Sequence, residues 1–244
     1  MAPVHERSIV GLLFPGQMGA AVGNAARADV VWASEGRSDA TRQRAAAFED
    51  VGSVEELVRS SDLILSICPP AIAEEVAEQV FGLGFQGLFV EANAVTPERM
   101  RRIGGLGPRV VDGSILAASG INLYLAGEES ETVGRLFENS DVRAIPLDAE
   151  LGAASALKMA FGGWNKIGIA LAAQAHAIAR AYGVDEWLEA EGVPEDRLPR
   201  MADRAWRWAP EMEEVADTCT EVDFSDAVPR AAGAFYRALS EERL

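Results

Sequence analysis

The longest apolar run in the chain covers residues 151–182. Small and apolar side chains follow one another almost without a break, and the run contains no proline. This pattern predicts one long helix, about 45–50 Å in length at a rise of 1.5 Å per residue. A helix that is apolar on nearly all sides must be buried on most of them. We therefore expect a helix that is shared between two domains or two subunits.

Before this helix, short branched apolar runs alternate with helical patterns. The runs predict strands at residues 8–13, 30–34, 62–67, 87–91, 109–112, 123–126 and 142–145. The intervening segments predict helices at residues 20–28, 54–60, 74–81, 97–103 and 131–139. Strands and helices that alternate through short connections are typical of a doubly wound, mainly parallel sheet.

The segment after the long helix has only helical patterns. Trp206, Trp208 and Met212 recur at helical spacing, which predicts a core-facing aromatic stripe, and a terminal helix is expected to begin near Pro229. The fold class is therefore α/β, with an N-terminal Rossmann domain over residues 1–148. An all-helical domain follows at residues 149–244, and the resemblance described below implies that it serves dimerisation and substrate binding.

Charge and cysteine content narrow the class of protein. The chain has 38 acidic and 22 basic side chains, a net charge of −16, which argues against a nucleic-acid partner. Cys68 and Cys219 form neither a disulfide framework nor a zinc pattern, so we expect a reducing cytoplasm and no metal site. No signal peptide is visible, and the apolar run carries too many polar residues to span a membrane. We expect no membrane partner.

The turn after the first strand carries the sequence FPGQMG. Gly16 would let the backbone approach a pyrophosphate, and Gly19 would let the following helix pack closely on the sheet. The free N–H groups at the start of that helix attract phosphate. Phe14 stands where a G-x-G-x-x-G motif has its first glycine. The position between strand and helix favours nucleotide binding over a purely structural glycine turn.

The loop after the second strand should meet the adenine ribose. Arg37 and Ser38 would suit a 2′-phosphate through a guanidinium fork and a hydroxyl group. Glu35 could instead accept a hydrogen bond from a free ribose 2′-OH, as in NAD-binding proteins. We favour NADP over NAD. The alternative is that Arg37, Arg42 and Arg44 are only a solvated loop and helix face.

Ligands of such sheets bind beyond the carboxyl ends of the strands. The segments at those ends are residues 14–19, 34–38, 68–70, 92–96 and 113–120. The candidate cofactor-binding residues are Pro15, Gly16, Gln17, Met18, Ser34, Arg37, Ser38, Cys68, Pro69 and Asn93. We interpret Cys68 as a small buried residue rather than a nucleophile, and His176 as a satisfied helix residue rather than an acid or base.

Lys158 is the candidate catalytic residue. It lies near the start of the long helix, with Gly162 and Asn165 on the same face at i+4 and i+7. If this face looks toward the strand ends, partial burial would lower the lysine pKa and allow acid–base catalysis. The alternative is a lysine whose stem packs while its head reaches water.

These residues carry a resemblance to a known family. The chain is similar to the β-hydroxyacid dehydrogenase and 6-phosphogluconate dehydrogenase superfamily, in particular to a subgroup with a helical C-terminal domain of unknown function. The matching stretches include GLLFPGQMGAAVG, LILSICPP, GLFVEANAVTPE, VVDGSILA, LGAASALKMAFGGWNK and RAWRWAPEMEE. The resemblance implies NADP or NAD binding, a homodimer intertwined around the long helix, hydride transfer, and Lys158 as the catalytic lysine.

The chain also departs from this family. Gly162 stands where family members have an asparagine one turn after the lysine. Asn165 lies about 10 Å from Lys158 along the helix axis, so it does not simply replace that asparagine. The stretch after Asp112 is shortened, which argues against a sugar-acid phosphate as substrate. We expect a small hydroxy or keto substrate in a pocket lined by Ser114, Ala117 and Asn165. Imine reduction and nicotinamide binding without catalysis remain the alternatives.

Overall fold

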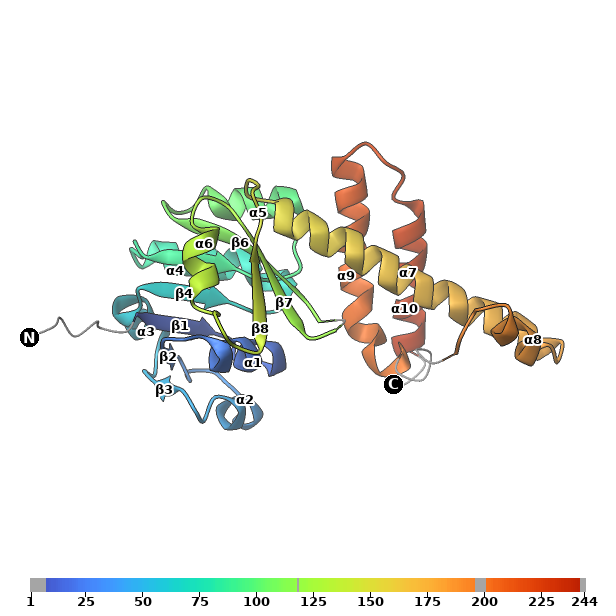
Figure 1. Cartoon of the computed structure of the whole chain (residues 1–244), viewed down its shortest axis with the longest axis horizontal. Helices are drawn as coiled ribbons and strands as arrows, with labels where there is room; N and C mark the ends of the chain where they lie inside the picture. Colours follow the sequence, from blue (N-terminus) through green and yellow to red (C-terminus); the bar gives the residue numbers. More distant parts are fainter. Residues whose placement is uncertain (1–7, 118, 196–200, 242–244) are drawn as a thin grey trace, which may run out of the picture. The chain divides into compact units, whose positions relative to one another are not determined.

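The computed structural model describes residues 8–117, 119–195 and 201–241. The chain divides into two compact units, Met1–Lys158 and Met159–Leu244. Helix α7 (Ala153–Ala181) begins in the first unit and continues through the second (Figure 1). The structure confirms the predicted order, in which a region with a sheet is followed by a helical region.

The first unit contains a sheet of eight strands within the described residues, in the order β3-β2-β1-β4-β5-β6-β7-β8. The strands are β1 (Ile9–Leu13), β2 (Asp29–Trp32), β3 (Glu49–Asp50), β4 (Leu63–Ser66), β5 (Leu88–Glu91), β6 (Val110–Leu116), β7 (Ile121–Ala126) and β8 (Val142–Pro146). All neighbouring pairs are parallel except β6 and β7. The chain order reverses between β1 and β4, which is where such sheets bind ligands.

Helices cover both faces of this sheet (Figure 1). They are α1 (Gln17–Ala25), α2 (Asp39–Arg44), α3 (Val54–Ser60), α4 (Ala73–Gly82), α5 (Pro97–Gly104) and α6 (Ser130–Arg135), with a short 3-10 helix at Pro70–Ile72. Ile64 and Phe89 pack in one core cluster with residues of α3, α4 and α5. Leu65 and Val90, which point to the opposite face, pack in a second cluster with residues of α1 and α6. The unit therefore has three layers.

Local signals placed several helices correctly. Ser53 caps α3, because its hydroxyl oxygen accepts a hydrogen bond from the backbone N–H of Glu56 at 3.2 Å. Thr96 caps α5 in the same way, and Pro97 occupies the first turn.

The strand predicted at residues 109–112 ends too early. Strand β6 continues to Leu116, because residues Asp112 to Leu116 pair antiparallel with residues Ala126 to Asn122 of β7. This pairing satisfies backbone groups that a loop would leave to water.

The second unit is helical. After α7 it contains α8 (Asp185–Ala190), α9 (Met201–Glu221) and α10 (Ala227–Glu241). Met212 and Tyr236 are fully buried, and the rings of Trp208 and Tyr236 meet edge to face at 5.3 Å. The predicted aromatic stripe is wrong for Trp206, which is 67% exposed. Trp208 and Met212 share a helix face at i and i+4, whereas Trp206 lies two residues before Trp208 and faces away.

Helix α7 is less buried in the single chain than its composition predicts. Trp164, Leu171, Ile178 and Tyr182 are all more than half exposed. None of the helices in the described part of the chain combines the length and hydropathy that a membrane-spanning segment requires.

Candidate functional site

The turn between β1 and α1 adopts a conformation that favours glycine. Phe14 has a φ of 58°, in the left-handed region, where a bulky residue is strained. This explains why the G-x-G-x-x-G motif has a glycine at this position. A Cβ at Gly19 would lie 3.0 Å from the Phe14 carbonyl oxygen, so close packing of α1 requires glycine there, as predicted.

The start of α1 fits a phosphate group. Gly16 is the N-cap and offers no side-chain hydrogen bond to the helix. A Cβ at Gly16 would meet only the Phe14 carbonyl oxygen, at 3.9 Å, so packing within the protein does not require glycine here. The missing side chain leaves space beside free N–H groups, and Pro15, Gln17 and Met18 frame this turn.

Arg37 is held over this turn from the loop after β2. Its guanidinium carbon lies 3.7 Å from the centre of the Phe14 ring, a cation–π contact. Its Nε is buried and has no hydrogen-bond partner among the described residues. Burial lowers the pKa of Arg37, although the side chain remains charged at neutral pH.

The other residues of the predicted ribose loop have partners within the protein. Arg42 donates to the Ser34 carbonyl oxygen at 2.9 Å, and Arg44 donates to the Pro15 carbonyl oxygen at 3.4 Å. Ser34 is buried. Burial alone would raise the pKa of Asp50 on β3, but hydrogen bonds from Ser34 contribute to a net lowering of that pKa. Ser38 caps α2 by accepting from a backbone N–H at 3.3 Å. Arg42 and Arg44 therefore shape the loop, while Arg37 keeps a donor available.

A buried polar cluster lies at the carboxyl ends of β4 and β5. The Asn93 side-chain amide donates to the Ser66 hydroxyl oxygen at 3.3 Å and to the Cys68 sulfur at 3.2 Å. The Asn93 backbone N–H donates to Glu91 Oε1 at 3.1 Å. These contacts bring two predicted site residues, Cys68 and Asn93, together. Pro69 follows Cys68 and is the N-cap of the 3-10 helix.

Burial dominates the titration of this cluster. It raises the pKa of Glu91 to about 8, with a smaller effect from the nearby Asp112 carboxylate. Burial and the Glu91 charge raise the pKa of Cys68 to about 12, so its thiol stays protonated at neutral pH. This supports the interpretation of Cys68 as a buried residue and not a nucleophile. Glu91 Oε2 is buried without a partner among the described residues.

Strand β6 fixes the position of Lys158. The Asp112 carboxylate accepts hydrogen bonds from the Gly152 N–H at 2.9 Å, the Ser155 N–H at 3.0 Å and the Ser155 hydroxyl at 2.7 Å. It thereby caps the start of α7. Burial raises the pKa of Asp112, against the lowering effect of these hydrogen bonds. Three residues further along the strand, the Ile115 carbonyl oxygen accepts from Lys158 Nζ at 2.8 Å.

The predicted substrate residues fall in different environments. Ser114 is fully buried on β6, and its hydroxyl has no hydrogen-bond partner in the described part of the chain. Ala117 is exposed just after the strand. Asn165 is half-buried on α7 within the second unit. Their assignment to one substrate pocket stays a prediction.

An ion pair explains the glycine that departs from the family. In the second unit, Lys166 Nζ lies 2.6 Å from Glu211 Oε1, and the two side chains are only 11% and 16% exposed. A Cβ at Gly162 would lie 2.8 Å from that same oxygen, so a side chain there would displace Glu211. The Tyr236 hydroxyl donates to the Lys166 carbonyl oxygen at 2.6 Å. Sequence reasoning missed this network, although a lysine within an apolar helix is a signal for a buried partner.

A family model matches part of the second unit. Residues 179–239 match the model of a domain of unknown function, DUF1932. No curated protein sequence matches the chain.

Solved structures match nearly the whole chain. MTH1747, a conserved protein of unknown function with structural similarity to 3-hydroxyacid dehydrogenases, is 25% identical, with 96% of this chain and 98% of that chain covered and a TM-score of 0.74. The Mycobacterium tuberculosis 3-hydroxyisobutyrate dehydrogenase with L-serine is 14% identical, with 96% of this chain and 94% of that chain covered and a TM-score of 0.72. The Aspergillus terreus reductive aminase with NADPH and ethyl-5-oxohexanoate is 16% identical, with 97% of this chain and 94% of that chain covered and a TM-score of 0.60. The chain has the NAD(P)-binding fold of the hydroxyacid dehydrogenases and imine reductases.

Proposed function

We propose that the protein is a cytoplasmic, NADP-dependent oxidoreductase of the β-hydroxyacid dehydrogenase type. It would transfer hydride between the nicotinamide and a small hydroxy or keto substrate. The observation that carries this proposal is the pairing of an uncapped helix start, at Gly16, with a guanidinium held on the Phe14 ring. Both features supply donors for the phosphates of a dinucleotide.

The unpartnered Arg37 Nε favours NADP over NAD, because a 2′-phosphate would accept its hydrogen bond. Glu35 in the same loop is the residue that would serve NAD. Proteins of this fold have been solved with NADPH and with NAD⁺, so the fold accommodates either nucleotide. The choice for this chain therefore depends on its own ribose loop.

Lys158 is the proposed acid or base. When bound, the nicotinamide would supply or accept the hydride. Lys158 would give a proton to the substrate oxygen during reduction, or take it during oxidation. Its hydrogen bond to the Ile115 carbonyl and the Asp112 cap on α7 would hold the ammonium group in place before substrate binds. Lys158→Ala should abolish turnover of a hydroxy or keto substrate while the cofactor still binds.

The first test is a titration with NADPH and, separately, NADH, followed by energy transfer from the five tryptophans to the nicotinamide. We expect tighter binding of NADPH. Arg37→Ala should weaken NADPH binding by about 10- to 100-fold, the effect of a lost charge-assisted hydrogen bond, and leave NADH binding nearly unchanged. Arg59→Ala is the matched control, because Arg59 is an exposed arginine on α3.

The outcomes separate the readings of the ribose loop. Equal or tighter NADH binding would transfer the ribose contact to Glu35 and replace NADP by NAD. Binding of neither nucleotide would overturn the proposal and favour a protein in which Phe14 has disabled the site.

Imine reduction is the second candidate, favoured by the fold shared with a reductive aminase. An imine nitrogen can arrive already protonated, so it depends less on a lysine acid. This candidate predicts turnover of cyclic imines with NADPH, and measurable activity in Lys158→Ala.

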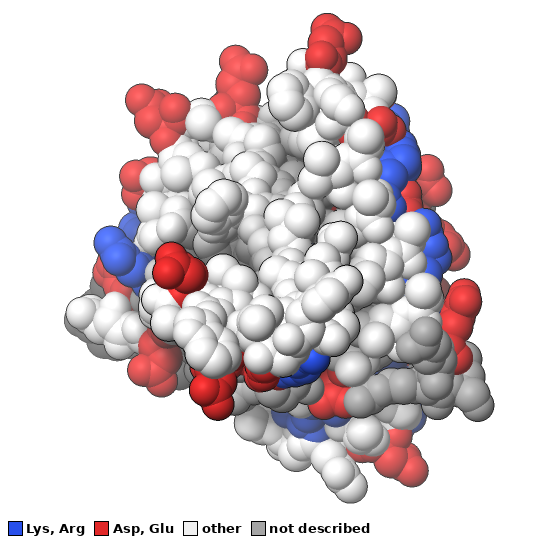
Figure 2. Space-filling view, turned by 90° about the vertical axis from the view of Figure 1, so that its right-hand side faces the viewer, with Lys and Arg blue, Asp and Glu red and all other residues white. Residues whose placement is uncertain are grey.

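We further propose a homodimer through α7 and the helical unit. Trp164, Leu171 and Ile178 are exposed at intervals of seven residues, the spacing of a helix–helix seam. Figure 2 views the side of the molecule that carries α8 and shows a broad surface of uncharged residues, with acidic side chains and some basic ones around it. Several large apolar side chains exposed along one helix are typical of an interface. A second copy brings the same stripe, so the surface is self-complementary.

Sedimentation velocity tests the dimer. Leu171→Glu should shift the protein to monomer, because it places a charge in the stripe. Ala177→Glu adds the same charge at an exposed α7 position outside the stripe and should leave the dimer intact. A wild-type monomer at all concentrations would rule out this assembly.

A further inference from the structure

The helical unit brings together three side chains that can bind a metal ion. They are His176 on α7, Glu189 on α8 and Glu195 in the segment after α8. One ligand atom from each lies within 4.8 Å of the others. The cluster lies wholly within residues 159–244, so it is separate from the proposed cofactor site.

His176 has a ring nitrogen that the protein does not use. The side chain is fully buried, and Nε2 lies 2.9 Å from the Val193 carbonyl oxygen. A carbonyl oxygen only accepts hydrogen bonds, so Nε2 carries the proton, and Nδ1 of the neutral ring has a free lone pair. Nδ1 is buried without a partner among the described residues. A histidine that donates one N–H to a carbonyl while its other nitrogen is free has the arrangement of a metal ligand.

The carboxylates supply the charge that a cation needs. Glu189 is exposed and Glu195 is half-buried, so an ion can reach the cluster from solvent. Arg180 forms an ion pair with one oxygen of Glu195, which leaves the second oxygen for another contact. The two carboxylates and one guanidinium around the imidazole carry a net charge of −1, which favours a divalent cation.

We propose that His176, Glu189 and Glu195 bind a divalent transition-metal ion of the zinc class, with water completing the coordination. Imidazole nitrogen and carboxylate oxygen are both donor atoms that Zn²⁺ accepts, whereas Ca²⁺ and Mg²⁺ prefer oxygen ligands alone. The sequence analysis expected no metal, because it considered only the cysteine spacing. Neither cysteine belongs to this cluster.

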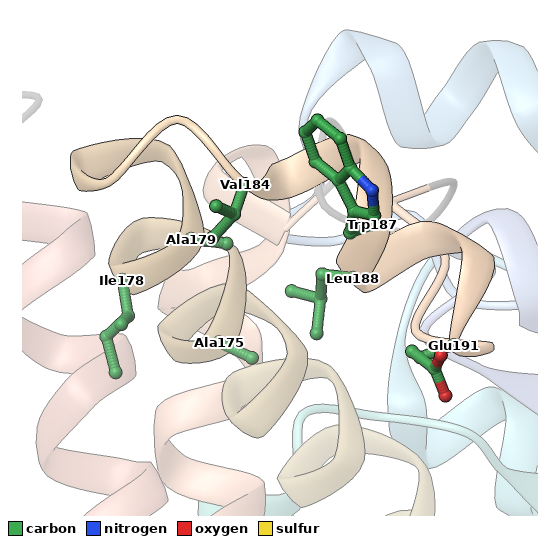
Figure 3. A pocket seen from close by; sticks show the side chains of 7 residues that line it. All are labelled: Ala175, Ile178, Ala179, Val184, Trp187, Leu188 and Glu191. Carbon is green, nitrogen blue, oxygen red and sulfur yellow. The ribbon is translucent and has the colours of Figure 1, made fainter.

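A bound ion would tie α8 to the end of α7. The two helices face each other across an open pocket of about 440 Å³ in which Ala175, Ala179 and Leu188 are lining residues (Figure 3). His176 and Glu189 are the immediate neighbours of Ala175 and Leu188 in the sequence. The ion would therefore hold the two walls of this apolar pocket together, and its removal should loosen α8.

Metal binding is tested on the full-length protein after dialysis against a chelator. Calorimetric titration with Zn²⁺ should give one ion per chain. Titration with Co²⁺ should give visible d–d bands of a low-coordinate site with nitrogen and oxygen ligands. His176→Ala and Glu189→Gln should each weaken binding by about tenfold or more. Glu186→Gln is the matched control, an exposed glutamate of α8 outside the cluster.

Each result decides the proposal. Glu189 is exposed, so its glutamine variant should fold even if the histidine variant does not. Unchanged Co²⁺ bands in Glu189→Gln would overturn the site, as would a sulfur-to-cobalt charge-transfer band, which would point to a cysteine. Failure to bind either metal would also overturn it. Loss of binding in both ligand variants and not in Glu186→Gln would establish the site, whatever the nucleotide titrations show.

Discussion

The strand ends of the sheet and the Lys166–Glu211 network of the helical unit bury polar groups in opposite ways. At the carboxyl ends of β4 to β6, Glu91 Oε2 and the Ser114 hydroxyl are buried without partners among the described residues. In the helical unit, Lys166 and Glu211 neutralise each other, and the Lys166 carbonyl accepts from Tyr236. Buried groups without partners among the described residues, as at these strand ends and at His176 Nδ1, are typical of a place where a ligand binds, whereas the paired Lys166 and Glu211 are typical of a structural network.

The largest test of this comparison is Glu211→Ala. It would leave the Lys166 ammonium group buried without its counter-ion, and the free energy of unfolding should fall by about 3 kcal/mol or more in a urea titration. Arg109 and Glu129 form a more exposed ion pair, so Glu129→Ala should lower the free energy of unfolding by less than about 1 kcal/mol. Equal effects of the two substitutions would contradict the structural role of the Lys166–Glu211 pair.

An intermediate effect is expected from Glu91, as a dependence of stability on pH. The folded chain keeps Glu91 protonated up to a pKa of about 8, while the ordinary value for the unfolded chain is 4.5. Between these values the folded chain binds more protons, so stability falls as pH rises, by up to about 1.4 kcal/mol per pH unit. Glu91→Gln should remove this slope. Chemical unfolding at several pH values measures it, and parallel profiles would refute the assignment.

The smallest effect is expected from Phe14→Leu. Leucine keeps an apolar side chain at the left-handed position but has no aromatic face for Arg37. Loss of a cation–π contact of about 0.5–1 kcal/mol should weaken NADPH binding roughly two- to fivefold, with little change for NADH. The same nucleotide titration measures this change. An equal loss for both nucleotides would show that Phe14 shapes the turn and does not orient Arg37.

The sequence predicted features that depend on neighbouring residues. Helix α3, the β1–α1 turn with Gly19, and the alternation of strands and helices all follow from local pattern. The continuation of β6 to Leu116, by contrast, depends on pairing with β7, and a local sequence pattern does not predict which strands pair.

The parts that sequence reasoning missed join distant positions. In the sequence, Glu91 is an ordinary polar residue at the end of a strand, and only the fold shows that its carboxyl group is buried. Lys166 and Glu211 are 45 residues apart, and Asp112 contacts residues 40 and 43 positions away. His176 was interpreted as satisfied, and only the fold shows that one of its nitrogens has no partner in the described residues. Such contacts follow from tertiary packing alone.

The closeness of Gly162 to Glu211 has an evolutionary consequence. A lineage that changed this glycine to the asparagine expected from the family would first meet a collision with the Glu211 carboxylate. A lineage that changed Glu211 first would strand the charge of Lys166. Each change alters the setting of the other two residues, so we expect the three positions to vary together among related sequences. A glycine beside an ion pair and an asparagine without one are then two alternative arrangements of the same helix face.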